Sequence, residues 1–268
     1  LKKNPRMVIL GAPGSGKSTF LRFLARKCAS DPRGPIPIIV SLRKYAEHLG
    51  NGGEMSLQDF GLKDQGRFEP HLRKAIEDGA RVLWLLDGLD EARGWQEDIR
   101  HSVRHIPGDL ILASRPIGYS REGLEKLLHF EVLPLSPDDT DKFLRDWFGH
   151  LSERLGKPGD WTEARVSWLK DQLSRKKGIE PLARNPLLLT FLVILAGQDP
   201  TVELPGRRSQ IFEKYVQKLL LSWEDRRLPR VGMLARAWDG GCPRAASQPG
   251  GPRPVGGSGS PQGLQGLG

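Results

Sequence analysis

The sequence predicts an α/β fold, in which a five-stranded, mainly parallel sheet is flanked by helices and followed by a helical subdomain. Short runs that are apolar throughout alternate with amphipathic stretches in the first half of the chain. This alternation is typical of strands buried on both faces of a parallel sheet. After about residue 136, apolar residues recur only at three- and four-residue spacing, which indicates helices. We therefore expect an α/β domain over residues 1–135 and a helical subdomain over residues 136–238.

The apolar runs give the order of the expected elements. Strands are expected at residues 7–10, 37–42, 81–87, 109–114 and 130–133. Helices are expected at residues 17–29, 71–78, 95–105, 138–148, 161–176, 186–196 and 207–225. Because parallel strands end at one edge of the sheet, and ligands bind at that edge, the residues that follow each strand are the first candidates for a site.

The last thirty residues differ from the rest of the chain. From Asp239 to Gly268 there are ten glycines and five prolines, with almost no large apolar side chains. Such a composition cannot offset the entropy of ordering, so we expect a disordered tail over residues 239–268. A shifted reading frame would explain the abrupt change. The chain begins with Leu1 and not methionine, so we also expect the sequence to be a fragment.

Composition narrows the class of protein only coarsely. The formal net charge is +9, which favours anionic partners, but the basic residues are scattered along the helices and solvated helix faces are the preferred explanation. The two cysteines, Cys28 and Cys242, support neither a disulfide framework nor a zinc site. The longest apolar run, residues 187–196, is too short to span a membrane. These features predict a cytoplasmic protein without a membrane span.

A glycine-rich loop connects the first expected strand to the first expected helix. Residues 11–19 match the pattern G-x-x-x-x-G-K-[ST] in the strand–loop–helix setting that supports it. Glycines let the backbone curl so that successive N–H groups point at phosphate oxygens, and the helix start adds unpaired amide donors. An ordinary glycine-rich turn is the alternative. The candidate nucleotide-binding residues of the loop are Gly11, Ala12, Pro13, Gly14, Ser15, Gly16, Lys17, Ser18 and Thr19.

Three side chains suit a magnesium–nucleotide complex. Lys17 can reach the β- and γ-phosphates, and the hydroxyl of Ser18 can bind Mg²⁺. Asp87 ends the third apolar run, where its carboxylate can hold Mg²⁺ from the side facing Ser18. The sequence contains no Asn-Lys-x-Asp motif for guanine. We therefore predict ATP or ADP with Mg²⁺ as the ligands, and Ser18 and Asp87 as the metal-binding residues.

Three further charged residues are the candidate catalytic groups. Asp90 and Glu91 come at the start of the next helix, where an acid can orient or deprotonate the water that attacks the γ-phosphate. Arg115 follows the fourth apolar run and can stabilise γ-phosphate charge. Helix capping is the alternative role for the two acids, and a solvated position before Pro116 is the alternative for Arg115.

These motifs resemble those of the NACHT family, a group within the STAND class of P-loop ATPases, in its bacterial form. The resemblance covers most of the chain, from Met7 to Arg227. Its most specific element is Asp87-Gly-Leu-Asp-Glu91, in which a small residue follows the first acid and further acids stand three and four places on. Residues 113–116, Ala-Ser-Arg-Pro, are similar to the sensor-1 segment of the family.

Two segments of the expected helical subdomain extend the resemblance. Residues 185–190, Asn-Pro-Leu-Leu-Leu-Thr, are similar to a motif whose proline packs near the adenine, and the resemblance implies this role for Pro186. Residues 204–215 resemble the segment that follows this motif in bacterial members.

The resemblance also implies a function. Members of the family act as switches, in which ADP holds a closed monomer, ATP permits self-association and slow hydrolysis resets the state. They join this ATPase to effector and sensor domains, often in defence or regulatory signalling, and here such domains are expected outside the given sequence. The alternatives are a remodelling or motor ATPase acting on nucleic acid or protein, a kinase or GTPase, and a pure interaction fragment.

Two other groups of residues are better explained by packing and solvation. His101 and His105 have the spacing of a metal-binding pair, but no third ligand suggests itself, so an exposed pair is expected. Four aromatic residues at helical spacing are expected in the core and not as a base-stacking platform: Phe143, Trp147, Trp161 and Trp168.

Overall fold

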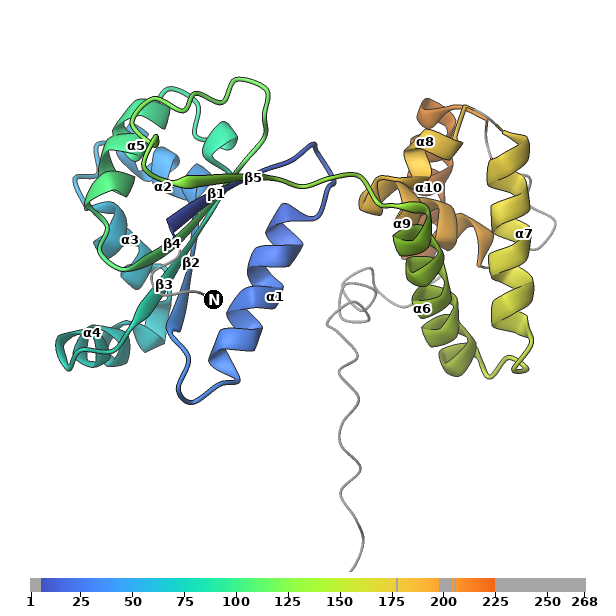
Figure 1. The fold of residues 1–268 in the computed structure, drawn as a ribbon, viewed down its shortest axis with the longest axis horizontal. Coiled ribbons are helices and arrows are strands. Elements are labelled where there is room, and N and C mark those ends of the chain that lie inside the picture. Colours follow the sequence, from blue (N-terminus) through green and yellow to red (C-terminus); the bar gives the residue numbers. More distant parts are fainter. Residues whose placement is uncertain (1–5, 177, 198–203, 205, 225–268) are drawn as a thin grey trace, which may run out of the picture. The chain divides into compact units, whose positions relative to one another are not determined.

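The structure is a computed structural model that describes residues 6–176, 178–197, 204 and 206–224. Its sheet has five strands in the order β2-β3-β4-β1-β5 (Figure 1), and every pairing between them is parallel. The strands are β1 (Arg6–Leu10), β2 (Ile36–Ser41), β3 (Val82–Asp87), β4 (Asp109–Ser114) and β5 (Leu128–Glu131). Helices flank this sheet and further helices follow it, which confirms the predicted fold class.

The described residues all belong to one compact unit, so the predicted boundary at residue 135 stays a prediction. The predicted tail over residues 239–268 lies outside the described residues.

The register of the sheet brings the ends of β1, β3 and β4 to one level. Leu10 pairs with Ser114 across β1 and β4, and Asp87 pairs with Ala113 across β3 and β4. Two backbone hydrogen bonds continue the ladder beyond the strands, from the Gly11 N–H to the Ser114 carbonyl (3.2 Å) and from the Gly88 N–H to the Ala113 carbonyl (3.1 Å). The loops after β1, β3 and β4 therefore leave the sheet side by side, with the end of β4 in the middle.

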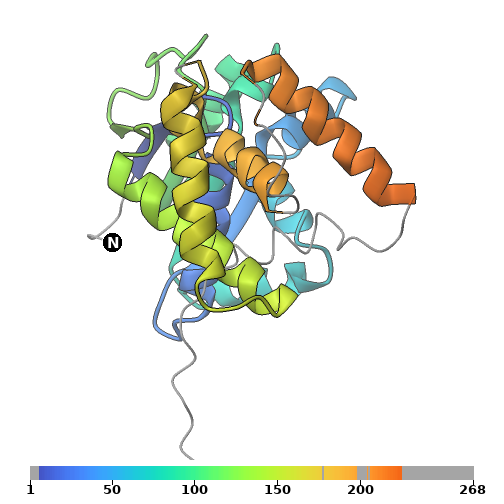
Figure 2. The ribbon, with the colours of Figure 1, turned by 90° about the vertical axis from the view of Figure 1, so that its right-hand side faces the viewer.

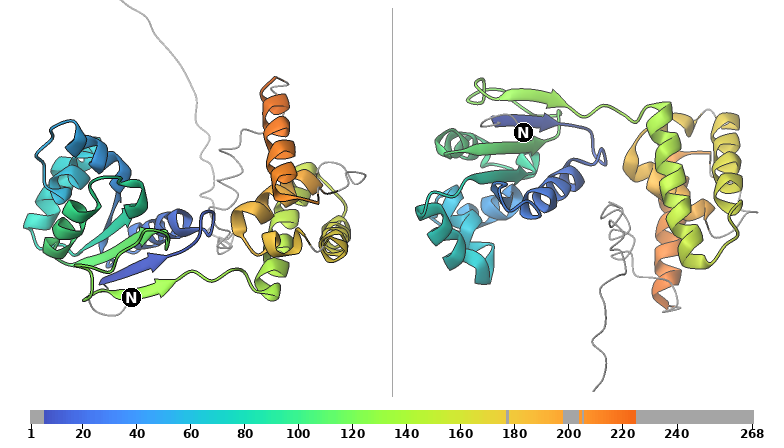
Figure 3. Two further views of the ribbon diagram at one scale, coloured as in Figure 1. Left: turned by 90° about the horizontal axis from the view of Figure 1, so that it is seen from above. Right: turned by 60° about the horizontal axis from the view of Figure 1, so that its bottom comes forward.

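The second and fifth strands end at other residues than the sequence predicted. Leu42 was expected in the second strand but begins helix α2 (Leu42–Gly50), because the Ser41 side chain caps that helix by accepting from the Lys44 N–H at 3.5 Å. The fifth strand begins at Leu128 and ends at Glu131, so the predicted range 130–133 is displaced. Strand β5 lies at the sheet edge beside β1 (Figure 3), with exposed side chains at most positions. Apolar runs mark buried strands and give little guidance at an edge.

The helices around the sheet include several that the sequence did not predict. Helix α1 (Lys17–Ala29) has the predicted bounds, whereas α2 and α3 (Leu57–Lys63) were not predicted. The remaining elements of this part are η1 (Gly66–Phe68), α4 (Glu69–Glu77), η2 (Leu89–Glu91) and α5 (Gln96–His105). Short helices such as α3 carry too few turns for a clear apolar period, which is why the sequence pattern missed them.

The sheet has a separate core on each face. On one face α1 packs Leu21, Leu24 and Cys28 against the strands. On the other face Val8, Leu86 and Leu112 are fully buried beneath residues of α2, α3 and α5. In Figure 1, α1 lies on one side of the strands and α2, α3 and α5 on the other. The central strands are thus buried on both faces, as their uninterrupted apolar runs predicted.

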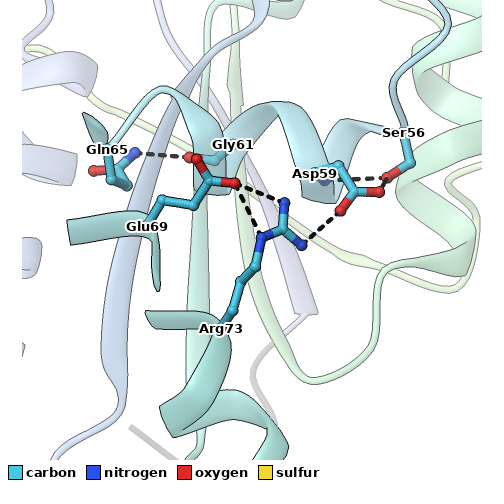
Figure 4. A network of polar contacts seen from close by, with 6 residues as sticks. All are labelled: Ser56, Asp59, Gly61, Gln65, Glu69 and Arg73. Atoms are coloured by element: carbon cyan, nitrogen blue, oxygen red, sulfur yellow. Dashed lines mark hydrogen bonds and ion pairs between the residues drawn. The ribbon is translucent and has the colours of Figure 1, made fainter. Parts of the chain in front are cut away.

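A polar network ties α3 to α4 (Figure 4). Arg73 bonds Asp59 (Nη1–Oδ1 2.9 Å) and Glu69 (Nη2–Oε1 2.9 Å), while Asp59 also accepts from the Ser56 hydroxyl at 2.7 Å. The hydrogen bond from Ser56, followed by that from Arg73, lowers the pKa of Asp59. Gln65 donates to the carbonyls of Gly61 (2.9 Å) and Ile39 (3.2 Å). These contacts hold the connection between β2 and β3 in place.

In the described part of the chain, five helices follow the sheet. They are α6 (Pro137–Leu155), α7 (Trp161–Arg175), α8 (Glu180–Ala183), α9 (Pro186–Ala196) and α10 (Arg208–Glu224). Figure 2 shows α7, α9 and α10 towards the viewer. Helix α9 has the predicted bounds, and most of its side chains are buried. Its Phe191 stacks on Tyr215 of α10, with 3.9 Å between ring centroids.

The aromatic residues singled out in the sequence divide into two pairs. Phe143 and Trp147 are buried, as expected for core residues. Trp161 and Trp168 are half-buried, and the guanidinium of Arg165 lies 5.4 Å and 6.0 Å from their ring centroids. None of the helices in the described part of the chain combines the length and apolarity needed to cross a membrane.

Candidate functional site

The loop between β1 and α1 has the curled backbone that its glycines predicted. Gly14 and Gly16 have φ angles of 76° and 94°, in the left-handed region that side chains disfavour. The Ser15 N–H donates to the Ala12 carbonyl at 3.1 Å. A Cβ atom added to Gly11 would lie 2.6 Å from the Ser15 Oγ and 3.1 Å from the Val132 Cβ, so a larger residue there would need these neighbours to shift.

Helix α1 begins at this loop with unsatisfied backbone donors. Gly16 is its N-cap and supplies no capping side chain, and the first turn contains no acidic residue. The leading N–H groups of a helix have no partner within the helix, and its dipole gives them partial positive charge. Acids and capping side chains usually satisfy this end. Here a bound anion would do so.

Lys17 reaches back over the loop. Its Nζ donates to the carbonyls of Gly11 (2.7 Å) and Ala12 (3.2 Å). Burial is the largest influence on its pKa and lowers it; among the charged neighbours, Asp90, Asp87 and Glu91 raise the pKa and Arg115 lowers it. Two conclusions follow. The four charged residues selected from the sequence lie within electrostatic range of Lys17, and the partly desolvated ammonium would gain from an anionic partner.

Asp87 stands at the end of β3 at the same edge. It is half-buried, and the chain turns immediately after it at Gly88, whose φ angle of 83° again requires glycine. Since β4 lies between β1 and β3, the end of β4 separates Asp87 from the loop that carries Lys17. The residue in that intermediate position is Arg115.

At this edge Arg115 contacts Asp90 through both its backbone and its side chain. The backbone N–H of Arg115 donates to Asp90 Oδ1 at 2.9 Å, and its Nε lies 2.9 Å from Asp90 Oδ2. Its Nη2 is 3.7 Å from Glu91 Oε1. The three residues predicted as catalytic therefore form one cluster, in which Asp90 is the best-satisfied acid and Glu91 is largely exposed.

The residue that sequence reasoning missed is Asn185. Its side-chain amide donates to the Pro13 carbonyl at 2.9 Å, and its Oδ1 accepts from the N–H groups of Leu187 (3.1 Å) and Leu188 (3.3 Å). The Leu187 N–H also donates to the Gly14 carbonyl at 3.2 Å. The sequence did contain a signal, because Asn followed by Pro is typical of an N-cap and first helical position. The predicted adenine contact, Pro186, is the residue next to this clamp.

Replacing Asn185 by alanine removes both the cap of α9 and the bond to the loop. We expect a loss of about 0.5–2 kcal/mol in the free energy of unfolding, the usual range for a lost N-cap. Asn185→Asp keeps the capping oxygen but loses the donor to Pro13, so it should retain most of the stability. Urea unfolding followed by circular dichroism measures both variants. Asn51→Ala, at the exposed end of α2, is the control, and equal stability of Asn185→Ala and the parent would contradict the capping role.

The edge offers a donor set that fits a magnesium–polyphosphate. Backbone amides and Lys17 supply positive charge on one side, and Asp87 supplies a carboxylate on the other. In the described ranges no group of three or more His, Cys, Asp or Glu side chains is arranged to hold a metal ion. A few carboxylates combined with phosphate oxygens and water are the usual ligands of Mg²⁺. His101 and His105 are exposed, with ring centroids 4.7 Å apart.

The fold and this site together define a class of protein. A parallel sheet whose first strand runs through a glycine-rich loop into a helix, with an acid ending a strand at the same edge, is that of a P-loop nucleoside triphosphatase. The NACHT domain model matches residues 5–151, more than half of the 268 residues, and the chain belongs to the NACHT family. The family is one of nucleotide-binding switches, and P-loop triphosphatases generally bind their nucleotide with Mg²⁺.

Solved structures with a similar fold have low identity to the chain. The structure of PCH-2 from C. elegans has a TM-score of 0.46 and 12% identity, with 80% of this chain and 61% of that chain covered. The Drosophila ORC bound to DNA has a TM-score of 0.40 and 11% identity, with 82% and 63% covered.

A Signal Transduction ATPase with Numerous Domains (STAND) protein from Pyrococcus horikoshii, with a tetratricopeptide repeat sensor, has a TM-score of 0.35 and 14% identity, with 88% and 37% covered. The chain thus spans less than two thirds of each of these three proteins, and at these TM-scores the likenesses carry no inference about its function. A search of curated proteins gave no match.

Proposed function

We propose that the chain binds ATP or ADP with Mg²⁺ on the loop of residues 11–19 and acts as a slowly hydrolysing regulatory switch. In the ATP-bound state it associates with further copies of itself, and hydrolysis returns it to the ADP-bound state. The function is signalling in the cytoplasm, in defence or in regulation, with effector and sensor domains outside the given sequence. Membership of the NACHT family supports the switch, and the site residues support the nucleotide.

Each side chain at this edge of the sheet has its own role in the proposed function. Lys17 and the amides at the start of α1 bind the β- and γ-phosphates. Ser18 and Asp87 hold Mg²⁺, which when bound neutralises phosphate charge. Glu91 orients the attacking water and Arg115 stabilises the charge on the γ-phosphate. Pro186 contacts the adenine, beside the clamp that Asn185 makes with the loop.

The observation that carries the proposal is the uncapped start of α1, which lies next to the half-buried side chain of Lys17. Gly16 leaves the helix dipole and its leading amides without a capping side chain, while the Lys17 ammonium donates to the carbonyls of Gly11 and Ala12, which are both neutral. Neutral carbonyls compensate a partly desolvated ammonium poorly. A polyphosphate satisfies both the helix and the lysine at once.

Calorimetry with ATP, ADP and GTP, each with Mg²⁺, tests the nucleotide. Binding of ATP and ADP in preference to GTP is expected, whereas no binding of any nucleotide contradicts the proposal and leaves an interaction fragment. Inorganic tripolyphosphate has the phosphates of ATP without its base, so comparing the two ligands tests the contact to the adenine. Pro186→Ala should weaken binding of ATP and leave that of tripolyphosphate unchanged.

Sedimentation velocity in ADP and in ATP tests the switch. Larger species in ATP support it. Hydrolysis that is fast and stimulated by DNA, RNA or an unfolded protein, without a change in assembly, would instead support a remodelling or motor ATPase.

A further inference from the structure

The carboxylate of Asp90 is bound by Arg115 through both of its oxygens. Oδ1 accepts from the backbone N–H of Arg115 and Oδ2 lies 2.9 Å from its Nε. The Asp90 side chain is only 15% exposed, so these two contacts and not bulk water satisfy it. Asp90 lies in η2 after β3, and Arg115 directly follows β4. The pair therefore joins the ends of two neighbouring strands.

We propose that Asp90 is a positioning residue, which fixes the guanidinium of Arg115 where it meets the γ-phosphate, and that it does not itself act on the water. This inference rests on the proposed function and assigns one role within it. A contact to Nε fixes the plane of the guanidinium while its outer nitrogens stay available, because Nε belongs to the edge nearest the side-chain stem. The Arg115 side chain is 45% exposed, which leaves it accessible to a ligand.

The electrostatics of Lys17 place Arg115 near the phosphate site. After burial, which is the main cause, and the opposing effect of Asp90, the charge of Arg115 is the next influence and lowers the pKa of Lys17. Two cations held within electrostatic range repel each other unless an anion lies between them. Asp90 compensates this repulsion in the free protein by pairing with Arg115. A γ-phosphate would add its own negative charge between the two cations.

Glu91 differs from its neighbour in each of these respects. Its side chain is 46% exposed, and its ion pair with Arg115 is the longer contact of 3.7 Å. It has oxygen atoms available to a water molecule, whereas each oxygen of Asp90 already accepts a bond from Arg115. The two adjacent acids thus have different roles, Glu91 toward water and Asp90 toward Arg115.

Affinities for ATP and ADP, measured with Mg²⁺ in the full chain, separate these roles. The ratio of the two affinities reports contacts to the γ-phosphate alone. We expect Asp90→Ala and Arg115→Ala to lower the ATP-to-ADP affinity ratio by the same factor, roughly ten- to a hundredfold for a hydrogen bond to a charged group, with ADP affinity unchanged. The double variant should lower the ratio no further, because each substitution already removes the same contact of Arg115 with the γ-phosphate.

Different outcomes would contradict this inference and the proposed function on which it rests. Asp78→Asn is the control, because Asp78 is an exposed aspartate before β3, and it should leave the ATP-to-ADP affinity ratio unchanged. If Asp90→Ala does not fold, Asp90→Asn keeps the acceptor for the Arg115 N–H and should lower the ratio by a smaller factor. An unchanged ratio in a folded Asp90 variant overturns the inference, as does slower hydrolysis when Asp90 is replaced in an Arg115→Ala background. A parent chain that binds neither nucleotide contradicts the proposed function itself.

Discussion

Replacing Lys17 by alanine is expected to abolish measurable binding of ATP while the chain stays folded. The substitution removes the charge that, in the proposed function, faces the β- and γ-phosphates and that donates to two neutral loop carbonyls in the free protein. Truncating one member of a desolvated charge pair costs about 2–5 kcal/mol, which corresponds to roughly 30- to 4,000-fold weaker binding. Calorimetry with ATP and Mg²⁺ measures the loss, and the far-ultraviolet circular dichroism should match that of the parent.

Lys27→Ala is the matched control for this experiment. Lys27 is an exposed lysine in the last turn of the same helix, ten positions beyond Lys17, at the end remote from the loop. It removes the same charge from the chain as a whole, so any difference between the two variants reports position and not net charge. Equal ATP affinity in Lys17→Ala and the parent would remove the loop from the proposed site.

Replacing Glu91 by glutamine is expected to slow hydrolysis by roughly 10²- to 10⁴-fold, the usual contribution of a positioned general acid or base. ATP affinity should not change, since Glu91 is exposed and lies beside Arg115 and not in the loop. Glutamine keeps the shape and one acceptor oxygen but cannot take a proton. Release of phosphate in a single turnover is the appropriate measurement, because the proposed parent reaction is slow.

Glu77→Gln serves as the control for this second experiment. Glu77 is exposed and ends α4, which precedes β3, so it belongs to the opposite edge of the sheet. Its hydrolysis rate should equal that of the parent. A Glu91→Gln variant that hydrolyses ATP as fast as the parent would exclude Glu91 as the group that acts on the water.

The central part of the fold followed from local patterns in the sequence. Strands β1, β3 and β4 carry uninterrupted apolar runs because they are buried on both faces, and the structure confirms them within one residue at each end. The predicted range of β5 was displaced because β5 is an exposed edge strand, where burial does not restrict side-chain type. Helix α2 was not predicted, and its first residue, Leu42, was assigned to the preceding strand because it is apolar and buried in the core.

The sequence predicted which residues belong to the candidate site, but it did not predict which of them contact one another. The loop of residues 11–19 was identified because a phosphate-binding turn needs fixed residue types at consecutive positions, and the acids were identified because they stand at and after the end of an apolar strand. The roles given to them stay predictions until the experiments above are done. Nothing in the sequence distinguished Asp90 from Glu91, because adjacent acids look alike until their partners are known.

The sequence by itself determined the central strands, the phosphate-loop motif between the first strand and the first helix, and which residues carry charge at the ends of the strands. These properties depend on neighbours along the chain. Only the tertiary structure decided that Arg115 binds Asp90, 25 residues away, and that Asn185 reaches the Pro13 carbonyl, 172 residues away. Such pairings depend on strand order and helix packing, because a hydrogen bond forms only when folding brings its donor to within about 3 Å of its acceptor.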